Sequence, residues 1–335
     1  MTLSLGIDIG TSGVRTCVLD AEGKLISTAR AVHVQQDTPA IDAEKWWTAV
    51  SICISRQIEA LKDLDRSGRD IHAISIDGTS GSMVLTDATL SPVSPALMYN
   101  SKGFDAEAKR IAASNAPTDH ITQGSNSALA RAMHLIKQAN GQPIHLLHQA
   151  DFIAAKLLGH GGLSDHNNAL KTGFDPEYGV WPAWMESVID PALLPKVSPV
   201  GTPWGTVSPQ TAHALALNPL ATVYAGTTDS IAAFLAAAPL ELGAAVTSVG
   251  STLAIKILSD ARVDRPKQGL YSHKIAEYWL VGGASNTGGA VLKHFFDDEA
   301  LATLSAQMDP AQPSGLDYYP LLSPGERFPV NDPSL

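Results

Sequence analysis

Residues 3–19 read LSLGIDIGTSGVRTCVL. The first seven are apolar around one acid, the small polar residues 10–13 favour a tight turn, and residues 14–19 are rich in β-formers. A further turn at residues 20–23 leads to a third β-rich run, 25–32. The pattern therefore predicts an antiparallel meander whose first turn is lined with Gly, Thr and Ser.

Helical and strand-like patterns alternate after this meander. Asp42 can cap a helix in which apolar residues recur at helical spacing over positions 47–61. A β-rich run, 71–76, follows and leads into the sequence DGTSG, and the clearest later helices cover 127–139 and 150–158. Strands that alternate with helices indicate an α/β architecture.

The opening unit recurs late in the chain. Residues 244–259 again combine an apolar run, a small polar tip (TSVGST) and a second apolar run, as residues 7–14 do, which suggests an internal duplication. A chain of 335 residues is long enough for two domains. Prolines interrupt every periodic pattern between residues 178 and 209, so we expect domains at 1–221 and 222–335.

Composition restricts the partners of the chain. It carries 33 Asp and Glu against 23 Lys and Arg, and this net charge of −10 disfavours nucleic acid and anionic membrane surfaces as partners. The apolar run 231–240 is too short to cross a bilayer, and the first ten residues lack the basic start of a signal peptide. Cys17 and Cys53 show no metal or disulfide spacing, so we expect a protein of the reducing cytoplasm.

The first turn is a candidate phosphate site. Glycines in residues 10–13 allow backbone N–H groups to approach a phosphate closely, and Asp8 could hold Mg²⁺ directly or through water. The alternative is a hairpin with a capping aspartate. These residues alone do not separate the two interpretations.

Three later segments carry similar signals. Asp229 stands where a strand pattern meets a helical one, so it is either an N-cap or a positioned general base. Residues 250–252 form the second polar tip, and the glycine-rich residues 282–290 precede a helical pattern, where a phosphate or ribose can bind. Glycine-rich turns are common, so each segment alone is a weak indicator.

Competing signatures are missing from the sequence. It contains no P-loop motif, no G-x-G-x-x-G spacing and no G-x-S-x-G elbow. His145 and His148 lie three residues apart, but no matching acid or cysteine cluster accompanies them, so we expect no histidine metal site.

In combination and in this order, four segments resemble the FGGY family of carbohydrate kinases: residues 6–15, 226–229, 249–252 and 282–289. That family belongs to the actin/hexokinase/Hsp70-like ATPase superfamily. The resemblance covers essentially the whole chain. It implies an α/β fold of two ribonuclease-H-like domains with an interdomain cleft, an N-terminal sugar-binding domain and a C-terminal nucleotide-binding domain.

Within the family the sequence looks most similar to the D-ribulose kinases of cyanobacteria and plants, which are xylulokinase-like. The segments that carry this likeness are residues 76–81, 165–171, 225–235, 271–274 and 314–320. One departure concerns residues 101–103, Ser-Lys-Gly, where many pentulose kinases have an acid and an arginine. A second is the end at Leu335, because family members continue further, so we expect a truncated C-terminal domain.

The resemblance also implies a role for individual residues. Asp229 would be the general base, and Asp8 would be the Mg²⁺ ligand close to both sugar and phosphates. Besides these two acids, the sugar contacts would be Ser12, Gly13 and Ser80. The ATP contacts would be Thr11, Ser12, Gly13, Gly250, Ser251, Thr252, Gly288 and Gly289.

The function implied is ATP-dependent and Mg²⁺-dependent phosphorylation of a ketopentose, D-ribulose to D-ribulose 5-phosphate. The alternatives are another substrate of the family, such as D-xylulose, L-ribulose or glycerol, and a non-catalytic sugar-binding protein with the same fold. The expected partners are the sugar and ATP. The sequence does not indicate an oligomeric state.

Overall fold

The chain divides into two compact units, Met1–Ala233 and Phe234–Leu335. Their structure, a computed structural model, describes residues 2–33, 40–316, 319–332 and 334–335. Asp317 and Tyr318, which belong to the segment 314–320 discussed above, lie outside the described residues.

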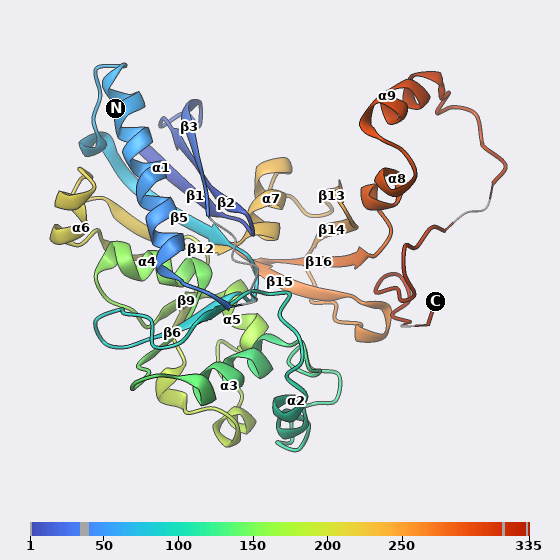
Figure 1. Cartoon of the computed structure of the whole chain (residues 1–335), viewed down its shortest axis with the longest axis horizontal. Helices are drawn as coiled ribbons and strands as arrows, with labels where there is room; N and C mark the ends of the chain where they lie inside the picture. The colour runs from blue at the N-terminus through green and yellow to red at the C-terminus, as the bar shows by residue number, and fades with distance from the viewer. Residues whose placement is uncertain (1, 34–39, 317–318, 333) are drawn as a thin grey trace. The chain divides into compact units, whose positions relative to one another are not determined.

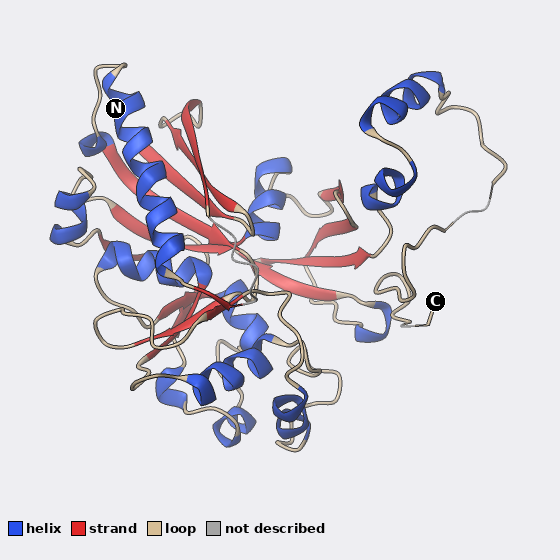
Figure 2. Cartoon of the chain, in the orientation of Figure 1, coloured by secondary structure: helices blue, strands red, loops and turns tan. Residues whose placement is uncertain are grey.

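A six-stranded sheet organises the first unit (Figures 1 and 2). The predicted meander is confirmed, because the first three strands pair antiparallel in sequence order. Strand β5 (Ile71–Gly78) pairs parallel to β1 (Leu3–Ile9), and β12 (Thr222–Thr228) pairs parallel to β5, so three strands end at the same edge of the sheet. In spatial order the strands are β11 (Pro203–Thr206), β12 (Thr222–Thr228), β5 (Ile71–Gly78), β1 (Leu3–Ile9), β2 (Gly13–Leu19) and β3 (Leu25–Val32).

Strand β12 also explains where the first unit ends. The sequence patterns suggested a boundary after residue 221, which assigns β12 to the second domain. In the structure β12 hydrogen-bonds to β5 inside the first sheet, and the division falls after Ala233. This pairing joins segments about 150 residues apart, and no local sequence pattern indicates such a contact.

Two helices pack side by side on this sheet. Helix α1 (Glu44–Lys62) contacts β2 and β3, and helix α4 (Gln149–Leu158) contacts β5 and β12. The inward residues of β1 alternate with outward ones, and Leu3, Leu5 and Ile7 are almost completely buried. Burial of each such side chain contributes roughly 1.5–3 kcal/mol, so the apolar core fixes the sheet edge on which the site is built.

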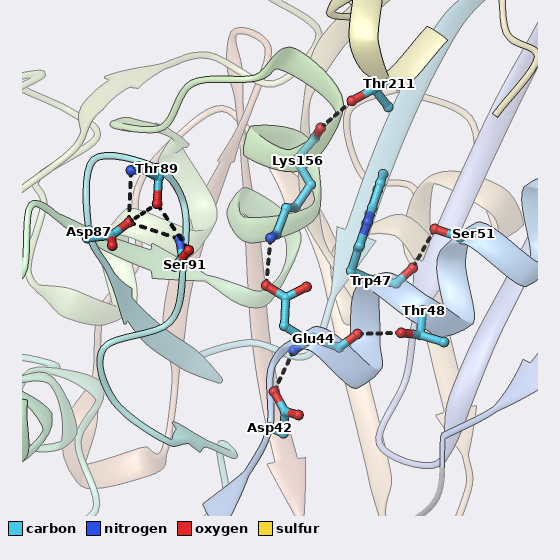
Figure 3. A network of polar contacts seen from close by, with 10 residues as sticks. All are labelled: Asp42, Glu44, Trp47, Thr48, Ser51, Asp87, Thr89, Ser91, Lys156 and Thr211. Carbon is cyan, nitrogen blue, oxygen red and sulfur yellow. Dashed lines mark hydrogen bonds and ion pairs between the residues drawn. The ribbon is translucent and has the colours of Figure 1, made fainter. Parts of the chain in front are cut away.

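Polar contacts also join these helices (Figure 3). Asp42, the predicted cap, lies one residue before the N-cap position, which Ala43 occupies, but its carboxylate still accepts a hydrogen bond from the Glu44 N–H (3.0 Å). Glu44 forms an ion pair with Lys156 of α4 (2.6 Å). The Lys156 carbonyl accepts from the Thr211 hydroxyl (3.0 Å) in α6 (Pro209–Ala214). Half-exposed ion pairs are worth about 0.2–1 kcal/mol, so this network orients the helices more than it stabilises them.

The remainder of the first unit packs around a second apolar core. The predicted helices 127–139 and 150–158 correspond to α3 and α4, and α4 ends at Gly159, which has a left-handed backbone. The further elements are β4 (Ala40–Ile41), β6 (Met83–Thr86), β7 (Ala96–Leu97), α2 (Asp105–Ala112), α3 (Ala128–Gln138), β8 (His145–His148), β9 (Leu163–Asp165), α5 (His166–Thr172) and β10 (Lys196–Ser198).

The second unit follows α7 (Asp229–Ala237), which spans the division, and contains an antiparallel sheet in the order β13-β14-β16-β15. The predicted hairpin over 244–259 is confirmed as β13 and β14. The elements are β13 (Ala245–Val249), β14 (Leu253–Ser259), β15 (Tyr271–Ile275), β16 (Tyr278–Ser285), α8 (Gly289–Phe295) and α9 (Asp298–Gln307). None of the helices in the described part of the chain combines the length and apolar character needed to cross a lipid bilayer.

Candidate functional site

Three carboxylates gather at one edge of the first sheet. Asp8 near the end of β1 lies beside Asp77 of β5 in the parallel ladder, and Asp77 lies beside Thr227 of β12. Asp229 follows two residues later as the first residue of α7. Carboxyl ends of adjacent parallel strands are the usual binding edge of α/β sheets, so the topology itself collects these acids.

The carboxyl of Asp77 has a strongly altered ionisation. Burial raises the pKa of its carboxyl to about 8, and the charges of Asp8 and Asp229 and a hydrogen bond with Asp8 act in the same direction. Arg15, whose guanidinium contacts the Asp8 carboxylate at 3.1 Å, partly offsets this rise in pKa. At neutral pH Asp77 is therefore predominantly protonated, which limits the repulsion among the three groups.

The DGTSG segment belongs to the predicted family motifs, but the sequence did not indicate a role for Asp77. The available signal was that Asp77, like Asp8, stands at the end of a β-rich run before a turn of Gly, Thr and Ser. Nothing in the local sequence shows that the two runs are neighbouring strands, so the pairing of their acids required the structure.

The turn between β1 and β2 is tightly fixed. The Gly10 N–H donates to the Gly13 carbonyl (2.9 Å), and the Ser12 carbonyl accepts from the His33 N–H (3.3 Å). A Cβ on Gly13 would lie 2.6 Å from the Ala31 carbonyl oxygen, so only glycine fits there. Thr11 is half-buried and Ser12 is exposed, which leaves this turn open to a ligand beside Asp8.

Asp229 stands at the junction of strand and helix that the sequence predicted. It begins α7 directly after β12, and its Oδ1 accepts a hydrogen bond from the Ser230 N–H (2.6 Å). Its side chain is half-buried and close enough to Asp77 to influence the pKa of that carboxyl. The hydrogen bond from Ser230 thus orients the carboxylate of Asp229, which is one of the three acids at this sheet edge.

Ser80 lies in the turn that follows β5, and this turn is held from two sides. The Arg131 guanidinium donates to the Gly81 carbonyl (2.6 Å), and the Gln149 N–H donates to the Ser82 carbonyl (3.0 Å). The Ser80 hydroxyl oxygen is buried and has no hydrogen-bond partner among the residues that the structure describes. Buried hydroxyls normally have a partner, so Ser80 is suited to bind a polar ligand group.

The remaining predicted residues form a separate group inside the second unit. The hairpin tip 250–252 packs directly on the start of α8: the Gly289 N–H donates to the Gly250 carbonyl (2.8 Å), and the Ala290 N–H donates to the Ser251 carbonyl (3.2 Å). A Cβ on Gly288 would lie 2.7 Å from backbone atoms of Ser251 and Thr252. Glycine at position 288 therefore permits the close approach of these two segments.

A cavity of about 730 Å³ adjoins this contact. It is lined mainly by apolar side chains and by the backbone near Gly288; its lining residues are Leu253, Thr287, Gly288, Val291, Leu292, Phe295, Phe296 and Pro320. An apolar cavity of this size beside a close backbone contact fits the base and sugar of a nucleotide.

The carboxylates at the sheet edge of the first unit suit a Mg²⁺ ion that takes only one or two protein ligands. Within the described ranges, no three His, Cys, Asp or Glu side chains are arranged to hold a cation by themselves. Mg²⁺ commonly takes only one or two carboxylates and completes its shell with water and substrate phosphates. Asp8, whose side chain is 34% exposed, can supply such a carboxylate.

Comparison with known proteins gives a consistent family match. Residues 3–236 match the N-terminal domain of the FGGY family of carbohydrate kinases. A xylulose kinase of Streptomyces coelicolor is 26% identical over 287 residues, which cover 79% of this chain and 56% of that protein. The chain thus spans about half the length of the curated relatives that it matches first.

Solved structures support the fold. A xylulose kinase from Rhodospirillum rubrum has a TM-score of 0.80 at 20% identity, covering 91% of this chain and 66% of its own. A structure from Brucella ovis described as a xyloylose kinase has a TM-score of 0.83 at 19% identity, covering 99% and 72%. These likenesses confirm the predicted α/β fold of the actin/hexokinase-like ATPases.

Proposed function

Because the chain belongs to the FGGY family of carbohydrate kinases, we propose that it transfers a phosphoryl group from ATP to a ketopentose. The substrate that we propose is D-ribulose, and the product is D-ribulose 5-phosphate. The observation that carries the proposal is the gathering of Asp8, Asp77 and Asp229 at one sheet edge of the matched domain. The preference for D-ribulose rests on the resemblance of segments such as 76–81 and 165–171 to D-ribulose kinases.

Asp229 is the general base in this proposal. A sugar hydroxyl is a poor nucleophile until its proton is removed, and a carboxylate beside it can accept that proton as the new O–P bond forms. The hydrogen bond from the Ser230 N–H orients Oδ1 of Asp229. The raised pKa of Asp77 keeps one neighbouring carboxyl neutral, so the sugar meets less negative charge.

Asp8 and two backbone segments handle the phosphates. When bound, ATP supplies the phosphoryl group, and Mg²⁺ neutralises the charge of its phosphate oxygens. We assign Asp8 to the Mg²⁺, with Thr11, Ser12 and Gly13 as phosphate contacts, and Ser12, Gly13 and Ser80 also as sugar contacts. The nucleotide contacts in the second unit are Gly250, Ser251, Thr252, Gly288 and Gly289. Their close packing, and the cavity that adjoins it, support this assignment.

D-Xylulose is the second candidate substrate. The relative from Streptomyces coelicolor is a xylulose kinase, and this observation favours the C3 epimer of D-ribulose. We further propose that the protein acts in the cytoplasm, where Cys17 and Cys53, both free thiols in the structure, would stay reduced.

The first test is ADP release by the 335-residue chain with MgATP. D-Ribulose, D-xylulose, L-ribulose and glycerol are compared with a control without sugar. The proposal expects sugar-dependent ADP with D-ribulose well ahead of the others. A preference for D-xylulose would correct the substrate, and sugar binding without ADP release would favour a non-catalytic binding protein.

The second test concerns Asp229. Asp229→Asn keeps the shape of the side chain but cannot accept the proton, so we expect turnover to fall by about 10²–10⁴-fold while sugar affinity is retained. Asp87→Asn is the matched control, because it removes an equal charge from a turn remote from the sheet edge. Appreciable turnover by Asp229→Asn would exclude Asp229 as the base.

Asp8 can be tested through the metal. Asp8→Ala is expected to abolish activity together with the dependence of turnover on Mg²⁺ concentration. An unchanged magnesium titration curve in this variant would show that another residue holds the cation.

A further inference from the structure

Gln149 begins α4 and is fully buried. Its Oε1 accepts hydrogen bonds from the Thr79 N–H (2.9 Å) and from the Thr79 hydroxyl (2.7 Å). This fixes the orientation of the amide, because a flipped amide would place its NH₂ group against the Thr79 N–H. The Nε2 donor therefore lies on the opposite side of the amide from Oε1.

That donor has no acceptor among the described residues. Gln149 Nε2 is buried, and no hydrogen-bond partner for it exists within the ranges that the structure describes. Buried amide groups in native proteins are almost always satisfied, and each exception needs an explanation such as a ligand or an ordered water.

Gln149 packs against the end of β5, the strand that carries Asp77. A Cβ on Gly78 would lie 3.2 Å from Gln149 Oε1, so the amide packs directly on the backbone at the end of β5. Gly78 follows Asp77 and pairs with Thr228, which precedes Asp229. The amide therefore packs beside Gly78, which follows Asp77 and whose partner in the ladder precedes Asp229.

A second buried group at this edge has no partner in the described part of the chain. The Thr228 hydroxyl belongs to a fully buried side chain, and its oxygen makes no hydrogen bond to any described residue. Together with Ser80, this places three unsatisfied polar groups around the end of β5 and β12. A ligand that carries several hydroxyls on adjacent carbons can satisfy such a set, whereas an apolar ligand cannot.

We propose that Gln149 Nε2 and Thr228 Oγ1 form a hydroxyl-binding subsite that determines which ketose is accepted. Gln149 donates to a hydroxyl other than the one that is phosphorylated, and Thr228 binds a neighbouring hydroxyl. This inference rests on the proposed function, because it assigns the subsite to the acceptor sugar. A site that pairs with substrate hydroxyls rejects analogues that lack them, since its own buried groups then remain unpaired.

The test pairs protein variants with deoxy sugars. Affinities of the full 335-residue chain for D-ribulose and for its 1-deoxy, 3-deoxy and 4-deoxy analogues are measured by calorimetry without nucleotide. The parent is expected to bind one analogue about 10- to 100-fold more weakly than D-ribulose. Gln149→Met should lose a similar factor for D-ribulose and should no longer discriminate against that analogue.

Thr79→Val serves as the matched control. It removes one bond to Gln149 Oε1 but leaves the Nε2 donor, so any loss of affinity should be the same for every sugar. Circular dichroism and thermal midpoints check that each variant folds. If Gln149→Met does not fold, the isosteric Thr228→Val provides the test. This variant should lose discrimination against the analogue that lacks the neighbouring hydroxyl.

The outcomes separate the subsite from the function on which it rests. Equal losses for all analogues in Gln149→Met, or a parent that tolerates every deoxy sugar, would overturn the subsite and favour a buried water as the partner of the amide. A parent that binds no ketopentose at all would overturn the proposed function as well. If Gln149→Met no longer discriminates against one deoxy analogue that the parent rejects, the result supports both the subsite and the proposed function.

Discussion

Asp77 lies between two acids at the sheet edge, so its ionisation affects the stability of the fold. In the unfolded chain its carboxyl ionises near pH 3.8, whereas in the folded protein its pKa is raised to about 8. Between these two values the folded state retains a proton that the unfolded state has lost. The contribution of Asp77 to stability therefore decreases as pH rises from about 4 to 8 and stays low above 8.

Asp77→Asn should remove this pH dependence. The amide resembles the protonated carboxyl and can still donate to Asp8, so we expect the variant to gain stability over the parent, on the order of 1–3 kcal/mol at pH 8.5, and little at pH 4. Urea unfolding of both proteins is measured at the two pH values in metal-free buffer. A stability difference that does not change with pH would contradict the assignment.

Arg131 is a buried cation that binds backbone oxygen. Its guanidinium is 1% exposed and donates to four carbonyls, among them those of Gly81 (2.6 Å) and Tyr99 (2.7 Å). Burial lowers the pKa of Arg131 only to about 10, so it remains charged at neutral pH. Its contacts join the turn that bears Ser80 to the loop after β7.

Arg131→Met leaves these carbonyls without their donor. We expect a loss of about 2–4 kcal/mol in the free energy of unfolding, and weaker ketopentose binding because the Ser80 turn is no longer held. The control is Arg110→Met on the exposed side of α2, which should change stability by no more than about 0.5 kcal/mol. Unchanged sugar affinity in a folded Arg131→Met protein would show that the turn does not depend on this residue.

Among the elements, the segment 325–332 is held to the second sheet by a buried carboxylate. Glu326 accepts hydrogen bonds from the Ser285 hydroxyl (2.6 Å) and the Asn286 N–H (2.7 Å) at the end of β16, and also from the Tyr319 hydroxyl. Burial alone would raise the pKa of Glu326, but these bonds favour the charged form and lower it to about 2.

The low pKa gives this segment a defined pH dependence. The unfolded carboxyl ionises near 4.5, so the stabilisation is fully present above that value and is lost as pH falls towards 2. Glu326→Gln should therefore increase hydrogen exchange of amides in 325–332 by about tenfold or more at pH 7, with a smaller difference near pH 2.5. Equal protection in parent and variant at pH 7 would contradict the role of the carboxylate.

Local sequence patterns were sufficient for the elements that depend on local physics. The meander from Leu3 to Val32 and the hairpin over 244–259 were predicted because alternation and turn residues are properties of neighbouring positions. Short strands such as β4 and β7, with two residues each, carry no such pattern. The predicted boundary after residue 221 differs from the division after Ala233, because no local pattern indicates that β12 pairs with β5.

The candidate site also contains some residues that local sequence patterns indicate and others that they do not. Asp8 and Asp229 could be selected because each stands at a strand end beside small polar residues, and the family resemblance suggested their roles. Asp77, Gln149 and Thr228 could not, because their properties arise from burial and from neighbours far away in sequence. A buried donor without a partner becomes visible only when the packing around it is known.

Across the chain, every residue assigned to the sugar belongs to the first unit, whereas the nucleotide contacts other than Thr11, Ser12 and Gly13 belong to the second unit. Asp8, Ser80, Gln149 and Asp229 are all within Met1–Ala233, whereas the hairpin tip 250–252 and the start of α8 are within Phe234–Leu335. Substitutions in the second unit should therefore weaken nucleotide binding selectively.

Gly288→Val tests this separation. A Cβ at position 288 would lie 2.7 Å from the backbone of Ser251 and Thr252, so valine must displace the hairpin tip from α8. We expect the affinity for a non-hydrolysable ATP analogue with Mg²⁺ to fall more than about tenfold, because the backbone groups around the phosphates lose their arrangement. D-Ribulose affinity, measured separately by calorimetry, should stay within about twofold, since no sugar contact in this assignment lies beyond residue 233. Ala302→Val on the exposed face of α9 adds similar bulk to the same unit and should change neither affinity. Parallel loss of both ligands in Gly288→Val would mean that the two units do not bind their ligands independently.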